Sequence, residues 1–584
     1  MTAAFFDPDI TPEETQAAVP EAAPAAKRDR ATRKQKPAGL LLAASLQTAA
    51  ALVWIPQAAL LALSVGIISD GGNTIDAVLA ALAILALGII RAAIDAAGGR
   101  IAFRTARNEL TSRRNLAVAA LAARSPLDIG KPASGFAASV VGEQAEAVVP
   151  YLARFQPVRM KASAVPLVIL ACILPVSWVA GLILLVSAPL IPVFMALIGW
   201  RAKAASEKQL AETGGLNAFL LDRLRGLATI RALGAVDITA VRLRADADSL
   251  RNRTMAVLKI AFLSSAVLEL FAALGVAATA VYIGFSLLGA INIGTWHGQL
   301  TLTQGLFILL LAPSFFEPLR ELSTVWHDRA NGEAALAALD ALSSHGSAIL
   351  GSDEPDPDDA RAVLAAPSVQ IDGLVFRHAP DLATVIDNLC LDVATGEHIA
   401  LWGASGSGKT TILSLIAGLA SQETGMIRIG GVPLTENNAG ALRRRMAWIG
   451  QRPHIFSGSL KRNVSLGRAD IDDGAIEDAL RAVRLDGVIA ANEIAAVGEG
   501  GLGLSGGEAL RLALARVAAN HDVGIIIADE PTAHLDAATA ADVTEALLAL
   551  AKGRTLIVAT HDPRLAARLD RIIHLETQRK GIAA

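Results

Sequence analysis

The sequence predicts an α-helical membrane domain with six spans, followed by a soluble α/β domain. Of the 584 residues, 53% are hydrophobic and only 18% are charged, against about 25% charged in soluble proteins. Long apolar stretches fill the first part of the chain, and strand-like and helix-like segments alternate in the rest. This composition excludes an ordinary soluble enzyme. The net charge of -3 gives no overall basic field, so nucleic acid is not an expected partner.

The expected domain limits follow the changes in composition. Residues 1–36 form a disordered tail, 37–342 the membrane domain, 343–362 a linker and 363–584 the α/β domain. A signal peptide would have an apolar core of about 7–15 residues, whereas the first apolar stretch here is longer and is therefore read as a retained span. The six expected spans cover 38–68, 75–97, 158–175, 178–199, 261–288 and 300–316.

The charges between the spans indicate the orientation of the chain. Connectors 69–74, 176–177 and 289–299 contain no Lys or Arg, whereas segments 100–159 and 201–259 contain many. Lys and Arg are retained on the cytoplasmic side, so both termini are expected to be cytoplasmic, and helices should extend from the membrane into the long segments. The alternative is a bundle of core helices in a soluble protein, which this alternation of charge disfavours.

A glycine-rich motif follows a short apolar run that is expected to be a strand at 398–402. The motif GxxxxGK[ST] comprises Gly403, Ala404, Ser405, Gly406, Ser407, Gly408, Lys409 and Thr410. Its glycines let backbone N–H groups point at phosphate oxygens, Lys409 reaches the β- and γ-phosphates, and the hydroxyl of Thr410 is offered to Mg²⁺. The motif therefore predicts nucleotide binding.

A second apolar strand at 524–528 ends in two acidic residues, Asp529 and Glu530. A carboxylate at the end of a core strand is costly unless a cation or water lies beside it. Asp529 is placed to hold the shell of Mg²⁺, and Glu530 is placed to polarise the attacking water. The alternative for these acids is a solvated strand end.

Further motifs have the order found in one family. Leu504 to Glu508 read LSGGE, Gln451 follows an apolar strand, Asp536 follows the acids, and His561 follows the strand at 555–559. This set resembles the nucleotide-binding domain of ATP-binding cassette transporters. The resemblance implies a hydrolytic ATP site with Mg²⁺, in a head-to-tail dimer where Ser505, Gly506 and Gly507 of one chain cover the nucleotide of the other.

The resemblance also implies a role for individual residues. Gln451 binds Mg²⁺ and senses the γ-phosphate, His561 contacts the γ-phosphate, and Thr411 joins the nucleotide contacts. His378 occupies the place of an aromatic residue that stacks on adenine in the family, and Phe376 is the alternative. Glu508 stands where the family usually has Gln.

Six spans followed by one cassette resemble a half-transporter of exporter type. Four short motifs occur in the membrane domain after the third span: APLIP at 188–192, LDRLRG at 221–226, FLSS at 262–265 and APSFFEPLR at 312–320. With these motifs the whole chain is similar to D-type subunits of the heterodimeric exporter needed for assembly of bacterial cytochrome bd. The resemblance implies a C-type partner subunit, a location in the bacterial inner membrane in contact with lipid, and cysteine, glutathione or haem as cargo. It also implies short coupling helices near 124–135 and 214–226. The alternatives are a homodimeric exporter of peptide, lipid or drug-like cargo, and a cassette protein that gates.

Three residues in or near the spans are candidates for contact with cargo. Arg91 lies deep in the second span, and it either attracts a carboxylate or forms an i,i+4 pair with Asp95. Trp326 and His327 follow the sixth span and are candidates for contact with a flat ligand or an iron, although a lone His near a helix end is more often structural. Glu269 is expected to hydrogen-bond between helices.

Overall fold

The structure is a computed structural model that describes residues 38–71, 73–189, 223, 226–291, 293–296, 298–344, 346–351, 366–379, 381–468, 470–485 and 504–575. The chain divides into two compact units, which are described separately. The first comprises the described residues up to Arg113 together with Gly142–Ala338, and the second comprises Arg114–Val141 with the described residues from Leu339 onward.

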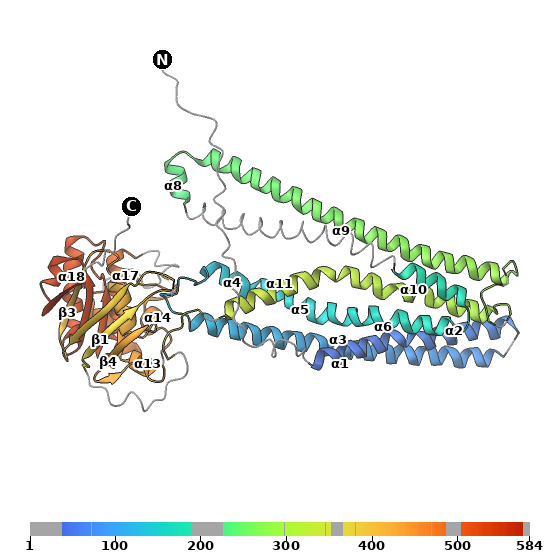
Figure 1. Ribbon diagram of the computed structural model, residues 1–584, viewed down its shortest axis with the longest axis horizontal. Coiled ribbons are helices and arrows are strands. Elements are labelled where there is room, and N and C mark those ends of the chain that lie inside the picture. The colour runs from blue at the N-terminus through green and yellow to red at the C-terminus, as the bar shows by residue number, and fades with distance from the viewer. Residues whose placement is uncertain are drawn as a thin grey trace, which may run out of the picture. The chain divides into compact units, whose positions relative to one another are not determined.

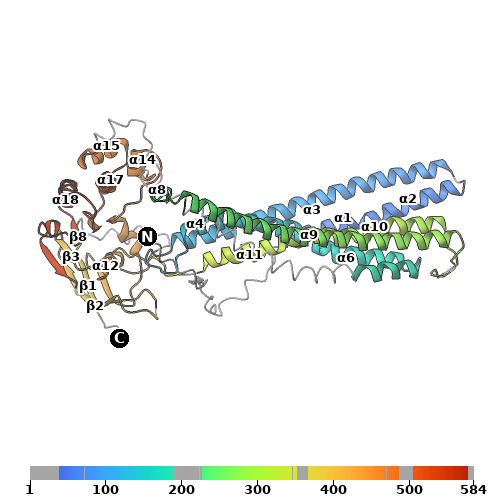
Figure 2. The ribbon, with the colours of Figure 1, turned by 90° about the horizontal axis from the view of Figure 1, so that it is seen from above.

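The first unit is helical (Figures 1 and 2). Its main helices are α1 (Ala38–Leu52), α2 (Trp54–Ser69), α3 (Thr74–Ala122), α6 (Gln156–Ile173), a helix at Trp178–Pro189, α8 (Leu227–Ala232), α9 (Val236–Leu287), α10 (Leu302–Thr324) and α11 (Trp326–Ser343). Short turns of helix, η2 (Gln144–Ala147), α5 (Val148–Pro150) and η3 (Tyr151–Phe155), precede α6. Helices α3 and α11 continue from this unit into the second.

Within the described residues, five helical stretches are long and apolar enough to cross a membrane: Gly39–Ser69, Ile75–Ala122, Ser134–Ile173, Ala266–Leu287 and Leu302–Ser343. The helix Trp178–Pro189 is the described start of the fourth predicted span, whose remainder lies outside the described residues. Helix α3 has 49 residues and α9 has 52, so at about 1.5 Å per residue each exceeds the roughly 30 Å of a bilayer core. The expected extension of helices beyond the membrane is confirmed.

Local chemistry explains the shape of the helical unit at two points. Pro56 has no N–H to donate to the carbonyl of Leu52, and the helical stretch Gly39–Ser69 is interrupted nearby, at Val53. Gly275 lets α9 approach α10 closely, because a Cβ there would lie 2.5 Å from Cζ of Phe316. Phe316 is 1% exposed and belongs to the core formed by α6, α9, α10 and the helix Trp178–Pro189, with Ile169, Ile173 and Leu311.

The second unit contains two β-sheets with helices packed against them (Figures 1 and 2). The antiparallel sheet has the order β2-β1-β4-β5 and consists of β1 (Val369–Phe376), β2 (Ile386–Val393), β4 (Thr424–Ile429) and β5 (Val432–Pro433). The parallel sheet has the order β6-β7-β8-β3-β9 and consists of β3 (His398–Trp402), β6 (Met446–Ile449), β7 (Ile525–Asp529), β8 (Thr555–Thr560) and β9 (Arg571–His574).

The helices of the second unit enclose two cores. The helices of this unit are α4 (Ser134–Gly142), α12 (Lys409–Ile416), α13 (Ala439–Arg444), α14 (Leu460–Ser465), α15 (Asp473–Ala482), α17 (Gly506–Ala518), α18 (Ala537–Ala551) and α19 (Pro563–Ala566). One core joins both sheets and α12, and includes Ile371, Ile412 and Ile527. The other joins the parallel sheet to α14, α15, α17 and α18. The buried strands β7 and β8 are apolar along most of their length, as expected of a parallel sheet covered on both faces.

The segment between α3 and α4 belongs to the second unit and contacts the rest of that unit at a few points. Ser125 donates its N–H to the carbonyl of Ser347 at 2.8 Å, and Leu127 packs against the core that includes α12. Residues 123–133 form turns, irregular backbone and an isolated bridge from Arg124 to Ala348, and α4 begins at Ser134. The short helix expected near 124–135 is therefore not formed there. An ion pair of 2.7 Å between Arg124 and Asp128 holds the turn in place of a helical ladder. Most of the second expected coupling segment, 214–226, lies outside the described residues.

Candidate functional site

The glycine-rich motif forms the loop between β3 and α12, as its position in the sequence predicts. Gly406 has φ +83° and Gly408, the N-cap residue of α12, has φ +87°, which are left-handed values that favour glycine. A Cβ on Gly403 would lie 2.6 Å from Oγ of Ser407. These glycines give the loop its tight path, which turns the N-terminal end of α12 toward the space enclosed by the loop.

Lys409, the first residue of α12, is 6% exposed and curls back over the loop. Its Nζ donates hydrogen bonds to the carbonyls of Gly403 at 2.7 Å and Ala404 at 2.9 Å. An ammonium group has three donors, so one remains for a ligand. The side-chain hydroxyl of Ser407 is buried and has no hydrogen-bond partner, which is a costly arrangement unless a bound group satisfies it.

The carboxyl ends of neighbouring parallel strands bring the acidic residues to this loop. Trp402, the last residue of β3, is in register with Thr560 on β8, and Ala559 on β8 is in register with Asp529 on β7. The hydroxyl of Thr410 donates a hydrogen bond to Oδ2 of Asp529 at 2.8 Å. Asp529 is 7% exposed. Burial raises the pKa of this carboxyl, the neighbouring charge of Glu530 raises it further, and the hydrogen bond from Thr410 and the charge of Lys409 oppose the rise.

Glu530 is held from two sides. Nε2 of Gln451, which follows β6, donates to Oε2 of Glu530 at 3.0 Å. Nδ1 of His561, which follows β8, lies 3.2 Å from Oε1 of the same carboxylate. Glu530 has φ +47°, an unusual backbone conformation for a residue with a side chain, and such conformations concentrate at functional sites. Gln451 and His561, from two distant parts of the sequence, thus meet at the carboxylate of Glu530.

The LSGGE motif begins a helix. Ser505 is the N-cap residue of α17, and its hydroxyl accepts the N–H of Glu508 at 3.3 Å while the carboxylate of Glu508 accepts the N–H of Ser505 at 2.7 Å. The N–H and hydroxyl of Ser505 hold the pKa of Glu508 below its usual range. Gly507 lies close to Thr539 on α18, because a Cβ there would be 2.3 Å from Cγ2 of Thr539.

His378 follows β1, and its ring contacts the segment between α3 and α4. Nδ1 of His378 lies 3.2 Å from the carbonyl oxygen of Leu127, and its ring meets Phe376 edge-on with centroids 5.2 Å apart. Phe376 itself is buried in the core. His378 is half-buried, and its contact with adenine stays a prediction.

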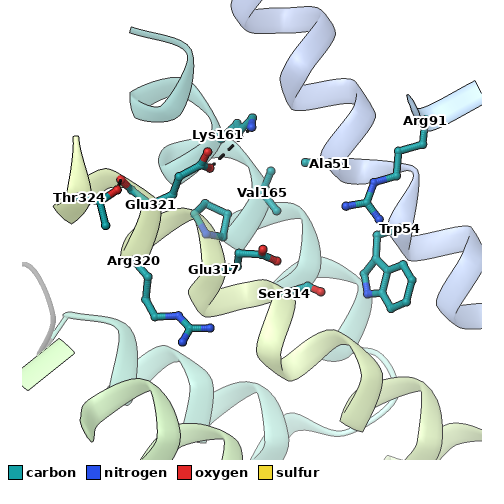
Figure 3. A pocket seen from close by; sticks show the side chains of 11 residues that line it. Ala51, Trp54, Arg91, Lys161, Val165, Ser314, Glu317, Arg320, Glu321 and Thr324 are labelled. Atoms are coloured by element: carbon teal, nitrogen blue, oxygen red, sulfur yellow. Dashed lines mark hydrogen bonds and ion pairs between the residues drawn. The ribbon is translucent and has the colours of Figure 1, made fainter. Parts of the chain in front are cut away.

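Arg91 lies in a separate site, a cavity of about 530 Å³ within the helical unit (Figure 3). Helices α1, α2, α3, α6 and α10 supply its lining, and an adjoining cavity of about 230 Å³ shares Arg91, Lys161 and Ala51. The guanidinium of Arg91 lies 5.8 Å from the centroid of the Trp54 ring. Asp95 lines the smaller cavity, and among the described residues no ion pair joins it to Arg91, so the i,i+4 pair is not formed.

Trp326 and His327 do not line either cavity. Both are at the start of α11, where Trp326 meets Phe155 edge-on at 6.1 Å and lies under the guanidinium of Arg329 at 5.4 Å. His327 is exposed. The expected role of Glu269 between helices is confirmed, because Arg320 on α10 donates to both of its carboxylate oxygens at 2.7–2.8 Å.

Comparison with known proteins gives matches to both parts of the chain. Residues 386–533 match the family model described as ABC transporter, and residues 40–311 match the one described as ABC transporter transmembrane region. The chain is 37% identical to the glutathione/L-cysteine transport system ATP-binding/permease protein CydD of Haemophilus influenzae, over 75% of this chain and 73% of that protein. This chain belongs to the ABC transporters.

Other relatives agree with this assignment. CydD of Escherichia coli is 36% identical over 74% of this chain and 73% of its own length. CydC of Bacillus subtilis, named as a protein of the same kind of transport system, is 29% identical over 73% of this chain and 72% of its own. A solved structure of a bacterial Atm1-family ABC exporter with ATP bound has the same fold, with a TM-score of 0.69 and 22% identity over 92% of this chain and 93% of that chain.

The family assignment confirms the main expectations from the sequence. The protein is an integral membrane ABC transporter that joins a helical membrane domain to a nucleotide-binding α/β domain, and it couples ATP hydrolysis to export. An ordinary soluble helical bundle is excluded by the transmembrane-region match. In this ABC transporter the phosphate loop, Asp529 and Glu530 belong to one cassette.

Several residues near these sites were not predicted from the sequence. Arg516 on α17 donates to the carbonyls of Asn463 and His454 at 2.9 Å, and so ties the LSGGE helix to the segment that follows Gln451. Burial lowers the pKa of Arg516. Nothing in the local sequence distinguishes Arg516 from a surface arginine. Lys161 on α6 and Glu317 on α10 could have been found, because each is a charged residue in or next to an apolar span.

Proposed function

We propose that this chain is the D-type half of a heterodimeric ABC exporter that moves cysteine or glutathione across the bacterial inner membrane, with a C-type half-transporter as its partner. The observation that supports this proposal is the 36–37% identity to two CydD proteins over about three quarters of each chain. Both termini face the cytoplasm in this proposal, because the connectors that contain no Lys or Arg would lie on the opposite side.

We infer that Mg²⁺ accompanies ATP at the phosphate loop. The donor set fits a hard cation, since a hydroxyl and a carboxylate oxygen lie together at Thr410 and Asp529. Gln451 follows β6, the strand paired with the one that ends at Asp529, and its amide nitrogen donates to Glu530. When bound, Mg²⁺ supplies charge neutralisation at the β- and γ-phosphates. Thr410, Asp529 and Gln451 are the residues that would hold it.

The residues around the phosphate loop then have separate tasks. Lys409 and the loop N–H groups bind the phosphate oxygens, and the free hydroxyl of Ser407 gains a partner there. Glu530 orients a water and accepts its proton, and Gln451 and His561 fix the direction in which its carboxylate faces. His561 contacts the γ-phosphate, and Ser505, Gly506 and Gly507 meet the nucleotide held by the partner subunit.

A single chain supplies only half of each composite ATP site in this scheme, so pairing is part of the mechanism. The LSGGE motif lies at the N-terminus of α17, where helix geometry leaves the N–H groups of Gly506 and Gly507 without intrahelical acceptors, whereas the N–H of Glu508 is bound by Ser505. The partner's phosphate loop would present that anion in the form of a bound triphosphate. The CydC relatives are proteins of the expected partner type.

Transport into inverted membrane vesicles tests the proposal. The chain is co-expressed with its C-type partner, and ATP-dependent uptake of labelled cysteine and glutathione is compared with uptake by vesicles carrying Glu530→Gln. Uptake of either thiol well above the Glu530→Gln level supports the proposal. Equal uptake by both kinds of vesicle, with normal ATPase activity of the unmutated protein, contradicts the cargo and leaves the homodimeric exporter of other cargo as the alternative.

A further inference from the structure

The cavity around Arg91 contains two opposite charges that are not paired with each other. Its lining includes five ionisable residues: Arg91, Lys161, Glu317, Arg320 and Glu321. Lys161 pairs with Glu321 at 3.6 Å, and Arg320 is engaged by Glu269, which lies outside the lining. Among the described residues, Arg91 and Glu317 form no ion pair with any side chain, and therefore lie more than 4.0 Å from each other's charged atoms. Figure 3 shows both among the side chains that surround the cavity.

The position of Arg91 makes an unpaired charge costly. It is half-buried on α3, within a helical stretch that is apolar enough to span the membrane. Ionisable groups in such segments are expensive and generally pair with another group or with a ligand. A cation–π contact with the face of the Trp54 ring offsets part of this cost, but the ring carries no negative charge that could neutralise Arg91. An anion in the cavity would complete the surroundings of Arg91.

The opposite wall offers acceptors for a cation. Glu317 is exposed to the cavity on α10, and the next residue is Pro318. Pro318 has no N–H, so the carbonyl of Ser314, four residues earlier, lacks its usual helical partner. Ser314 also lines the cavity. An ammonium group has three donors and would find a carboxylate and a carbonyl on neighbouring turns of one helix.

We propose that this cavity binds a small zwitterion of amino-acid type, with its carboxylate on Arg91 and its ammonium group on Glu317. The volume of about 530 Å³ lies within the usual range of small-molecule sites, about 300–1,000 Å³. Trp54, Ala51 and Val165 give the ligand an apolar surface between the two charges. The identification of this ligand with transported cargo rests on the proposed function, whereas the binding itself does not.

The residues that line the cavity indicate which chemical features of a ligand it recognises. It contains no Cys or His, and no cluster of possible metal ligands occurs in the described part of the chain. The site therefore recognises charge and size and does not recognise the thiol itself. Haem is a dicarboxylate and has no ammonium group to bind Glu317. With one carboxylate on Arg91, its second carboxylate would lie near the carboxylate of Glu317 and be repelled by it. The cavity thus favours an amino acid or short peptide.

Binding of four related ligands separates the two charges. Cysteine and S-methylcysteine carry both charges, N-acetylcysteine carries only the carboxylate, and cysteamine carries only the ammonium group. Their affinities are measured by calorimetry on the full heterodimer in nanodiscs, for the unmutated protein, Arg91→Gln and Glu317→Gln. Arg107→Gln is the matched control, because Arg107 is also on α3 in the first unit, pairs with Glu146 and lies outside both cavities.

We expect cysteine and S-methylcysteine to bind with similar affinity, and each of the two cavity variants to weaken both by roughly tenfold or more, since each removes one charged hydrogen-bonding partner. Glu317→Gln should leave N-acetylcysteine unaffected, and Arg91→Gln should leave cysteamine unaffected. Arg107→Gln should bind all four ligands like the unmutated protein. Unchanged unfolding temperatures of the variants would exclude a loss of folding as the cause.

The binding and transport experiments distinguish failure of the zwitterion site from failure of the proposed cargo. Binding of cysteine with unchanged affinity in both cavity variants overturns the zwitterion site even if thiol export is observed. The absence of binding by any of the four ligands overturns it as well. Charge-dependent binding without thiol uptake keeps the site and contradicts the proposed cargo.

Discussion

Gln451 and Glu530, which follow neighbouring parallel strands, are joined by a hydrogen bond of 3.0 Å from the amide nitrogen to the carboxylate. The bond fixes one oxygen of Glu530, and His561 lies beside the other. A carboxylate fixed in this way has little freedom to turn, so any displacement of Gln451 displaces the group proposed to polarise water. The geometry connects the segment after β6 directly to the chemistry of hydrolysis.

Replacing Glu530 by Gln should separate binding from hydrolysis. The variant keeps the phosphate loop and loses the proton acceptor, so we expect ATP to bind with nearly unchanged affinity and turnover to fall by roughly 10²–10⁴-fold. Nucleotide binding and steady-state ATPase activity are measured on the purified heterodimer. Glu545→Gln, which removes an exposed carboxylate paired with Arg568, is the control and should retain full activity. Turnover of Glu530→Gln near the unmutated rate would show that this residue is not the base.

Replacing Asp529 by Asn should stabilise the nucleotide-free protein at neutral pH while it abolishes hydrolysis. Burial raises the pKa of Asp529, so the folded state holds its proton more tightly than the unfolded state does. Stability is therefore lost as the pH rises from the unfolded pKa through the folded pKa, and the cost of the buried carboxylate is fully present above that. Asn carries no charge and can still accept the hydrogen bond from Thr410. We expect a higher unfolding temperature for the variant at pH 7.

The difference should shrink on acidification, because Asp529 of the unmutated protein then becomes protonated and the cost disappears. Thermal unfolding without nucleotide at a series of pH values measures this. A variant that is less stable than the unmutated protein at pH 7 would mean that the carboxylate has a stabilising partner, and the burial argument would be wrong.

Glu508 should make a pH-dependent contribution of the opposite sign. The N–H and hydroxyl of Ser505 lower the pKa of Glu508 below 4.5, so its contribution to stability is fully present above that value and is lost as the pH falls through the folded pKa. Glu508→Gln should reduce the unfolding temperature slightly at pH 7 and leave it less sensitive to acid. Asp478→Asn, at an exposed residue of α15, serves as the control. Equal acid sensitivity of Glu508→Gln and the unmutated protein would contradict the capping argument.

A substitution at Gly507 tests the close approach of α17 to α18. Gly507→Ala would place a Cβ 2.3 Å from Cγ2 of Thr539, and overpacking of this kind costs about 1–3 kcal/mol. Thr539→Ser removes that methyl group and keeps the hydroxyl that donates to Asp536 at 2.6 Å. We therefore expect Thr539→Ser to restore most of the stability lost in Gly507→Ala. Additive losses in the double variant would locate the strain elsewhere.

The sequence predicted those parts of the site that depend on local chemistry. The glycine-rich loop, Lys409 and the strand that ends at Asp529 were placed correctly, because each motif carries its own backbone requirement or hydrophobic pattern. Contacts between distant segments could not be predicted in this way. Arg516 binds Asn463 across 53 residues and His378 meets Leu127 across 251 residues, and no periodicity in the sequence marks either pair.

The membrane domain shows the same limit. Helical spacing permitted an ion pair between Arg91 and Asp95, but the direction of the Arg91 side chain depends on where α2 places Trp54. The spacing of charges along one helix does not reveal the ring on another. Lys161 lies near the start of the predicted span 158–175, and the sequence alone does not indicate that its side chain shares a cavity with Arg91.

The grouping of residues 114–141 with the cassette affects how the ATPase can be studied in isolation. A soluble fragment that begins at the first strand of the cassette would lack Leu127, which packs on its core, and the carbonyl that lies beside His378. Such a fragment would expose an apolar patch to water and free the histidine ring to move. Its solubility and nucleotide affinity would then report on the missing segment as much as on the enzyme, and adding a peptide of residues 114–141 should correct both.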